Sequence, residues 1–188
     1  RSSSGHIVAG LTEDGLVREV AEVRSAAADR PRAGRPGIML ELVPDAVSFL
    51  GIEIGVEHIS TVAIDLRARI VASNSEPFDG KATGPEEAVA RAIAAALQAV
   101  PAERLARCEG LGIATPSHMD RNGTIRLAPL LGWRNVALAD LARSHLPIPL
   151  PVMAENDANA LAIGATYGRR EPHSGVTLFL VMETGVGG

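Results

Sequence analysis

Residues 151–168 have the pattern of an apolar strand that leads directly into a helix, with polar side chains at the junction. Pro151-Val152-Met153 favours a strand, and the Ala-rich residues 158–167 favour a helix that ends at Gly168. Glu155-Asn156-Asp157 stands between them. An Asn or Asp in such a place often only caps the helix by accepting a backbone N–H. The same amide and carboxylate also suit sugar hydroxyls, and this segment alone leaves both interpretations open.

From residue 47 onward, apolar runs alternate with helical patterns. Three β-rich runs separated by short polar turns predict a meander, at 48–54, 59–66 and 69–73. Pro85 begins a predicted helix with apolar residues at helical spacing, and a second helix is predicted over 138–145. Further strands are predicted at 111–113 and, as a buried strand, at 176–181. Strands followed by covering helices indicate a layered α/β domain.

Composition excludes several classes of protein. The net charge of −4 gives no global attraction for nucleic acid, so a DNA-binding surface would have to be local. The single cysteine, Cys108, rules out an internal disulfide framework, and its apolar neighbours predict a core thiol. No metal site is predicted in this chain. No apolar stretch approaches the roughly 20 residues of a membrane helix, and no leader opens the chain, so the expected compartment is the cytoplasm.

Five short motifs follow one another along the chain. In order, they are Gly51-Ile52-Glu53-Ile54-Gly55, Gly112-Ile113-Ala114-Thr115-Pro116 with Asp120 and Gly123, Leu131-Gly132-Trp133, Glu155-Asn156-Asp157-Ala158-Asn159-Ala160 and Thr184-Gly185-Val186-Gly187-Gly188. Together they resemble the ROK family, the sugar kinases and sugar-responsive repressors built on an actin-like ATPase fold. The resemblance implies an α/β fold with an actin-like, ribonuclease H-like N-terminal lobe over 41–188. It also implies a second lobe beyond this chain, which holds a structural zinc in many members.

The resemblance assigns roles to the residues of the predicted sugar site. In ROK kinases the residue that matches Asp157 is the general base on the sugar hydroxyl, and the residue that matches Asn156 holds neighbouring hydroxyls. Glu155 is expected behind them, and Thr115 and Pro116 are expected in the turn close to the sugar. A carboxylate that accepts from a hydroxyl can orient it for binding and can remove its proton in transfer. Without ATP, the same groups still form a ligand site.

The first glycine turn departs from the kinase pattern. ROK kinases carry Asp-x-Gly-Gly-Thr there, whereas this chain has Glu53-Ile54-Gly55-Val56-Glu57. Val56 is β-branched, which disfavours a close approach of the backbone to phosphate. Glu57 places a carboxylate where a hydroxyl would meet the phosphate, and two like charges about 4 Å apart cost on the order of 4 kcal/mol. The turn is therefore predicted to be a hairpin connection that does not bind nucleotide.

A second glycine turn keeps a kinase alternative open. Thr184, Gly185, Gly187 and Gly188 are candidates, with Gly55, for a phosphate loop. In that alternative the protein is an ATP- and magnesium-dependent sugar kinase with Asp157 as its base. No cofactor is predicted otherwise.

Residues 1–40 contain the features that could contact DNA. The serine run before Ile7, Val8 and Leu11 predicts a capped helix that ends at Asp14-Gly15, and a short strand over 16–20 follows. The order resembles the second half of the winged helix-turn-helix of ROK repressors. A recognition helix uses short polar residues at its N-terminal end. The candidates for DNA contact are Arg1, Ser2, Ser3, Ser4 and His6.

An arginine-rich segment follows, Arg30-Pro31-Arg32-Ala33-Gly34-Arg35-Pro36. Pro and Gly keep it extended, and extended arginine-rich peptides suit the narrow minor groove of DNA. Arg32 and Arg35 are therefore further DNA-binding candidates, although the segment could equally be a solvated linker. Residues 1–40 are predicted to be a partial winged helix-turn-helix with this wing or linker.

These features predict a sugar-responsive transcriptional regulator of the repressor type. Its partners would be operator DNA and a sugar or sugar phosphate. A twofold operator would require a dimer, so a homodimer or a higher homo-oligomer is expected. Ligand would shift the population away from the DNA-competent form. The alternatives are the sugar kinase and a ligand-free scaffold that keeps the fold for dimerisation.

Overall fold

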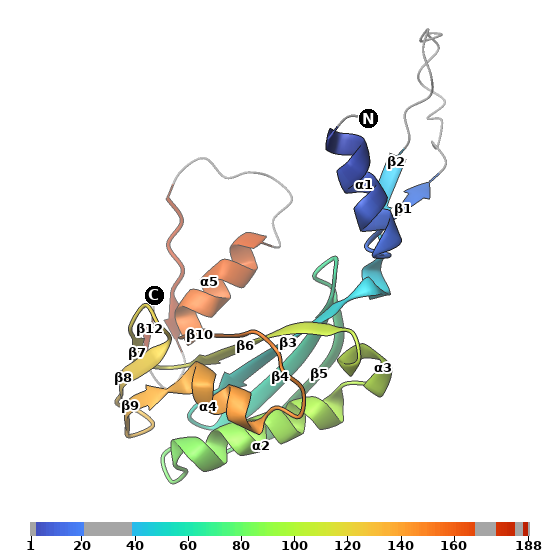
Figure 1. Cartoon of the computed structure of the whole chain (residues 1–188). Coiled ribbons are helices and arrows are strands. Elements are labelled where there is room, and N and C mark those ends of the chain that lie inside the picture. Colours follow the sequence, from blue (N-terminus) through green and yellow to red (C-terminus); the bar gives the residue numbers. More distant parts are fainter. Residues whose placement is uncertain (1–2, 21–38, 168–175, 183–185, 188) are drawn as a thin grey trace, which may run out of the picture.

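The computed structural model describes residues 3–20, 39–167, 176–182 and 186–187. Its centre is a five-stranded sheet with the strand order β10-β6-β3-β4-β5 (Figure 1). The strands are β3 (Ser48–Ile54), β4 (His58–Asp65), β5 (Ile70–Pro77), β6 (Cys108–Thr115) and β10 (Val152–Asn156). The first three form the predicted antiparallel meander, while β6 runs parallel to β3 and β10 parallel to β6.

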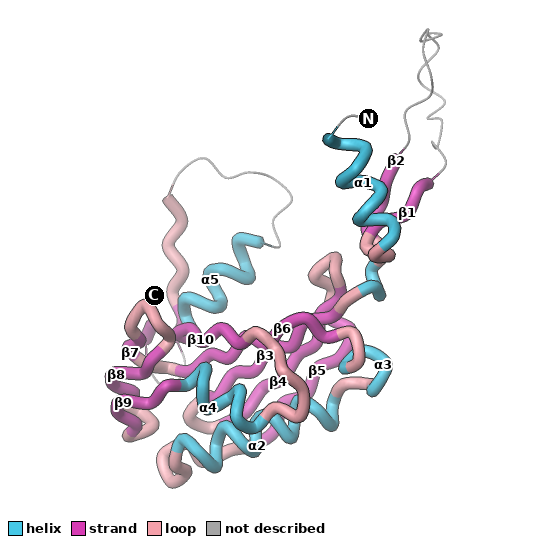
Figure 2. Tube along the Cα trace, in the orientation of Figure 1, coloured by secondary structure: helices cyan, strands magenta, loops and turns pink. Residues whose placement is uncertain are grey.

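One face of this sheet is buried by two helices. Alternate residues of β3 are buried, with Ile52 and Ile54 among them, because side chains of a strand alternate between its faces. The helix α2 (Pro85–Ala99) covers that face with Val89, Ile93 and several alanines, which are small enough for close packing. The short helix α4 (Leu138–His145) packs beside it. Figure 2 shows α2 and α4 along one side of the sheet and α5 (Asp157–Tyr167) on the other.

Burial predicts how the core responds to the loss of one methyl group. Ile54 is 0% exposed in β3, whereas Ile70 at the start of β5 is 68% exposed. Ile54→Val should lower the free energy of unfolding by about 0.5–1.5 kcal/mol, because the cavity left behind refills only in part. Ile70→Val, the matched control, should change it by less than about 0.5 kcal/mol in the same urea titration. Equal effects of the two substitutions would contradict this packing.

A second, three-stranded sheet lies beside the ends of β6 and β10. Its strands are β7 (His118–Met119), β8 (Thr124–Ala128) and β9 (Trp133–Ala137). Ile125 and Ala128 of β8 and Trp133 of β9 are buried, and the Trp133 indole donates a hydrogen bond to the Thr83 carbonyl at 3.1 Å. This sheet was not predicted from the sequence, because its strands are short and carry several polar residues. The short helices η1 (Pro44–Ala46) and α3 (Ala102–Leu105) were not predicted either.

A helix and a hairpin precede the sheet. The helix α1 (Ser3–Glu13) ends where it was predicted, and Gly15 follows it with a φ of +72°, which a glycine adopts readily. The strands β1 (Val17–Val20) and β2 (Met39–Leu42) then pair antiparallel. We call α1, β1 and β2 the head, and the described residues from 44 onward the lobe. Figure 1 shows the head projecting from one end of the sheet.

The predicted buried strand over 176–181 is wrong. Residues 176–180 form no regular element, and Val176, Leu178 and Leu180 are exposed. Only Val181–Met182 forms a strand, β11, which pairs with β12 (Val186–Gly187). An apolar run indicates burial only where another layer covers it, and no strand of the main sheet lies next to this run. The helix α5 is similarly uncovered, since Leu161 and Ile163 are largely exposed.

Candidate functional site

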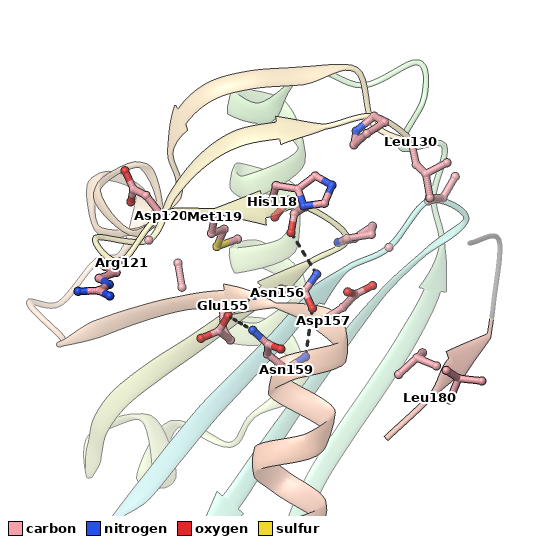
Figure 3. Close-up of a pocket in the computed structure, with 18 of the residues that line it drawn as sticks. His118, Met119, Asp120, Arg121, Leu130, Glu155, Asn156, Asp157, Asn159 and Leu180 are labelled. Carbon is pink, nitrogen blue, oxygen red and sulfur yellow. Dashed lines mark hydrogen bonds between the residues drawn. The ribbon is translucent and has the colours of Figure 1, made fainter. Parts of the chain in front are cut away.

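A cleft of about 930 Å³ opens where β6 and β10 end (Figure 3). These strands are parallel and Asn156 stands opposite Thr115 in the register, so their carboxyl ends lie side by side. Ligand sites of α/β sheets form at such ends. The cleft is lined by Gly55, Val56, residues 116–121, Gly123, Pro129, Leu130, residues 154–157, Asn159, Leu178, Leu180 and Val181. The sequence motifs around 116 and 155 are therefore brought together.

Asn156 holds the two walls of the cleft in place. Its Oδ1 accepts the backbone N–H of Asn159 at 3.1 Å, which caps α5. Its Nδ2 donates to the Ser117 carbonyl at 3.1 Å, which ties β10 to the turn after β6. The capping interpretation and the site interpretation therefore both apply to this residue. Asn156 lines the cleft, but much of its hydrogen-bonding capacity is already used by the protein.

The two neighbouring carboxylates each keep an oxygen available. Glu155 Oε1 accepts the backbone N–H of Asn156 at 2.8 Å and the Asn159 amide at 3.0 Å. Asp157 Oδ1 accepts the backbone N–H of Ala158 at 2.8 Å, in the first turn of α5, where a negative charge is stabilised by the helix dipole. Among the described residues, Glu155 Oε2 and Asp157 Oδ2 have no hydrogen-bonding partner. These oxygens can accept hydrogen bonds from ligand hydroxyls.

Thr115 differs from its predicted place at the ligand. Its side chain is fully buried, and its hydroxyl donates to the Ile54 carbonyl at 2.8 Å, which joins β6 to β3. Successive side chains of a strand point to opposite faces of the sheet, and the Thr115 side chain points to the buried face. Thr115 therefore supports the turn and does not line the cleft. Pro116, predicted with it, does line the cleft, and so does His118, which is exposed at the start of β7 (Figure 3).

Asp120 and Arg121 are cleft residues to which the sequence analysis gave no ligand role. Asp120 Oδ1 accepts the backbone N–H groups of Thr124 at 3.0 Å and Asn122 at 2.9 Å, and its Oδ2 pairs with Arg126 at 2.8 Å. The Thr124 N–H, aided by Asn122 and Arg126 and opposed by partial burial, lowers the pKa of Asp120. Both oxygens of Asp120 are thus occupied by contacts that stabilise the β7–β8 hairpin. Its place in an Asp-Arg-Asn-Gly turn is the sequence signal for that role.

The turn at Gly55 is filled by the protein's own groups. The Gly55 N–H donates to the His58 carbonyl at 2.9 Å, and a Cβ at Gly55 would lie 2.9 Å from the His58 ring. His58 Nε2 in turn lies 3.6 Å from Glu53 Oε2. Val56 is buried, and its carbonyl accepts the Gly80 N–H at 2.8 Å. The turn is a closed hairpin connection, as the sequence predicted, with an imidazole packed against its glycine.

Several predicted residues cannot be placed in a site. Arg1, Ser2, Arg32, Arg35, Thr184, Gly185 and Gly188 lie outside the described residues. Gly187 belongs to β12, while Ser3 and Ser4 begin α1 and His6 is exposed on it. In the described ranges, no three His, Cys, Asp or Glu side chains gather as metal ligands would. No helix of this part of the chain is long and apolar enough to cross a membrane.

Comparison with known proteins decides the family. The sequence model of the ROK family matches residues 49–188. The chain belongs to the ROK family. That match includes the main sheet from residue 49 onward, the cleft and the five motifs, so the predicted membership is confirmed.

Relatives within the ROK family include both repressors and kinases. The xylose repressor of Bacillus spizizenii is 26% identical over 181 residues, which cover 94% of this chain and 44% of the repressor. The glucokinase of Streptomyces coelicolor is 31% identical over 140 residues, which cover 74% of this chain and 42% of the kinase. The chain therefore spans less than half the length of these relatives.

A solved ROK structure confirms the fold class. The crystal structure of a ROK family transcriptional regulator, described as a homolog of the E. coli MLC protein, superposes with a TM-score of 0.58. The superposition covers 86% of this chain and 39% of that chain at 19% identity, so the likeness concerns the fold alone. The predicted α/β fold, here with a mixed sheet, is confirmed as one shared with ROK proteins.

Proposed function

We propose that this chain is the DNA-binding and sugar-sensing part of a ROK-family transcriptional repressor. One observation carries the proposal: the xylose repressor aligns with 94% of the chain, so the alignment includes most of the head, whereas the glucokinase aligns with 74%. A helix followed by a two-stranded hairpin is also what the second half of a winged helix-turn-helix requires. The head would bind operator DNA, and the actin-like lobe would bind the effector.

The charges in the cleft favour an unphosphorylated sugar as the effector. Glu155 and Asp157 present unpaired carboxylate oxygens, Asp120 is already paired with Arg126, and Arg121 is the one arginine among the described lining residues. Two like charges about 4 Å apart cost on the order of 4 kcal/mol near a protein surface, which disfavours a phosphate. Hydroxyl groups, in contrast, donate to carboxylates and are distinguished by their stereochemistry. Xylose, the sugar in the relatives' names, is neutral.

Sugar would act on DNA binding through linkage. If the sugar binds more tightly to a form of the protein that binds DNA weakly, it shifts the population toward that form. The operator must then weaken sugar binding by the same factor. A twofold operator implies a homodimer in which two heads reach successive half-sites.

A sugar kinase is the second candidate. The glucokinase relative and the position of Asp157, which could serve as general base toward a sugar hydroxyl, favour it. ATP and magnesium would be needed only in this case. The turn at Gly55 counts against it, because the His58 ring fills the space beside the glycine and Glu57 adds a negative charge.

A calorimetric panel separates the two candidates. The intact protein is titrated with D-xylose, D-glucose, N-acetylglucosamine and the corresponding phosphates, each with and without ATP and magnesium. The repressor proposal expects a neutral sugar to bind with no consumption of ATP. Stoichiometric conversion of ATP to ADP on addition of a sugar would establish the kinase.

The arginine-rich segment, which lies outside the described residues, carries its own prediction. Arg35→Ala should weaken operator binding about threefold to tenfold, because one arginine no longer enters the minor groove. The slope of log K against log salt should become shallower by about one. Fluorescence anisotropy with labelled promoter DNA at several salt concentrations measures both quantities. An unaltered slope would make the segment a linker without DNA contact.

A further inference from the structure

The turn between β4 and β5 is held in a defined shape at the end of the sheet nearest the head. The buried Asp65 carboxylate accepts the backbone N–H groups of Arg67 at 2.8 Å and Arg69 at 2.9 Å. Leu66 N–H donates to the Pro44 carbonyl at 3.1 Å, which fixes the turn against the chain that leads out of the head. The position of the Arg67 backbone is therefore set by the lobe.

The Arg67 side chain reaches from this turn to the head. Its guanidinium donates to Glu41 Oε2 at 3.1 Å and to the Leu42 carbonyl at 3.0 Å. The other oxygen of Glu41 accepts from Arg18, across the hairpin in β1. The hydrogen bond from Arg18, and to a smaller extent the one from Arg67, holds the pKa of the Glu41 carboxyl below its usual value. Glu41 thus joins the hairpin to the lobe.

Few other contacts fix the orientation of the head. The Val43 N–H donates to the Leu16 carbonyl at 2.9 Å and continues the hairpin into the connecting segment. Within the described ranges, the side-chain hydrogen bonds between the head and the lobe all come from Arg67. Figure 1 shows the head reaching away from the sheet beyond this point. A change in this cluster would therefore change how the head sits on the lobe.

The strand that leads into this turn, β4, reaches the cleft at its opposite end together with its neighbour β3. β3 and β4 pair continuously from Ser48–Asp65 to Ile54–Ile59. The turn that follows β3 contains Gly55 and Val56, which line the cleft. An eight-residue strand is roughly 26 Å long, so β4 spans the distance between the cleft and Arg67 as one rigid element. Rigid elements of this kind can carry coupling between distant sites.

We propose that the Arg18–Glu41–Arg67 cluster is the joint through which sugar binding in the cleft changes the orientation of the DNA-binding head. The inference rests on the proposed function and assigns its regulation to named residues. The cluster stabilises one orientation of the head. When sugar moves the β3–β4 hairpin, Arg67 moves with the turn and carries Glu41 and the hairpin of the head with it. Glu41 and Arg67 are positioning residues, because neither touches the sugar.

Two substitutions test the joint in the intact protein. Glu41→Gln and Arg67→Gln each remove the ionic link between head and lobe while keeping a side chain of similar size. The readout is the ratio of the Kd for labelled promoter DNA of the protein's own gene with saturating D-xylose, or the sugar that binds in the calorimetric panel, to the Kd without it. Both substitutions should lower this ratio about threefold to fivefold. The Kd of the sugar for DNA-free protein should stay within about twofold of wild type.

Control variants decide whether the effect belongs to the joint. Glu76→Gln removes a comparable carboxylate–arginine pair within the lobe, Arg91–Glu76 at 2.7 Å, and should leave the ratio unchanged. Arg67→Gln keeps the Arg18–Glu41 pair, so it carries the test if Glu41→Gln does not fold. If Arg67→Gln has the same Kd ratio as wild type, Arg67 does not couple the cleft to the head. That result would overturn the proposed joint, even if Arg18→Gln, which acts within the head, alters the ratio. The proposed function would remain intact. A wild-type protein whose DNA binding ignores sugar would overturn the proposed function and the joint together.

Discussion

Asp157→Ala should lower the affinity for sugar between roughly tenfold and a hundredfold. The carboxylate lies in the cleft with Oδ2 unpaired among the described residues, and a hydrogen bond to a charged group contributes about 1.5–3 kcal/mol. Operator binding in the absence of sugar should stay within about twofold of wild type, because Asp157 is distant from the head. Calorimetry measures the first effect and anisotropy the second.

Asp140→Ala is the matched control for this substitution. Asp140 also lies in the first turn of a helix, α4, but it is exposed and does not line the cleft. Both substitutions remove one negative charge from a helix N-terminus, so both should lower the unfolding free energy by a similar, small amount. Only Asp157→Ala should weaken sugar binding. Unchanged sugar affinity in a folded Asp157→Ala variant would show that the sugar does not bind in this cleft.

His6→Glu should weaken operator binding on the order of 30-fold or more. His6 is exposed on α1, whose first turn contains no acidic residue. If α1 enters the groove as proposed, a carboxylate on it would face the phosphates, and like charges brought together at an interface cost several kcal/mol. Sugar affinity should not change. Anisotropy with promoter DNA at a fixed salt concentration gives the operator Kd.

His6→Gln is the control that separates the effect of the added negative charge from the effect of losing the imidazole. Glutamine is polar and neutral, so its effect should be within about fivefold if repulsion causes the loss in His6→Glu. The loss in His6→Glu should also become smaller as salt is raised, because screening weakens the repulsion. Equal operator affinity for His6→Glu and wild type would place α1 away from the DNA.

The sequence predicted the main sheet well because its burial pattern is local. Alternating burial along β3 and the three- to four-residue spacing in α2 are properties of neighbouring residues, and the structure has both. The run at 176–181 has the composition of a buried strand, yet burial depends on what lies above it, which composition does not encode. The strands β7 to β9 were missed for the related reason that their stability comes from the buried Trp133 and Ile125, contributed by separate short segments.

The sequence indicated which motifs lie together at the candidate site, whereas the contacts of single residues differ from those expected. The motifs around Pro116 and Asp157 indicated one cleft, and the parallel register of β6 and β10 joins them there. The direction of the Thr115 side chain follows from which face of β6 is buried, and its hydrogen bond to Ile54 could not be found from spacing alone. The packing of His58 against Gly55 likewise depends on the shape of the hairpin turn.

The role of this protein as a sugar-responsive repressor is best tested by operator binding of the intact protein as a neutral sugar is added. Promoter DNA of the protein's own gene is labelled, bound at a fixed salt concentration, and titrated with D-xylose and then with the other sugars of the panel. We expect one neutral sugar to release the DNA and the corresponding sugar phosphate to leave it bound. DNA that remains bound at saturating concentrations of every sugar that calorimetry shows to bind would contradict this role.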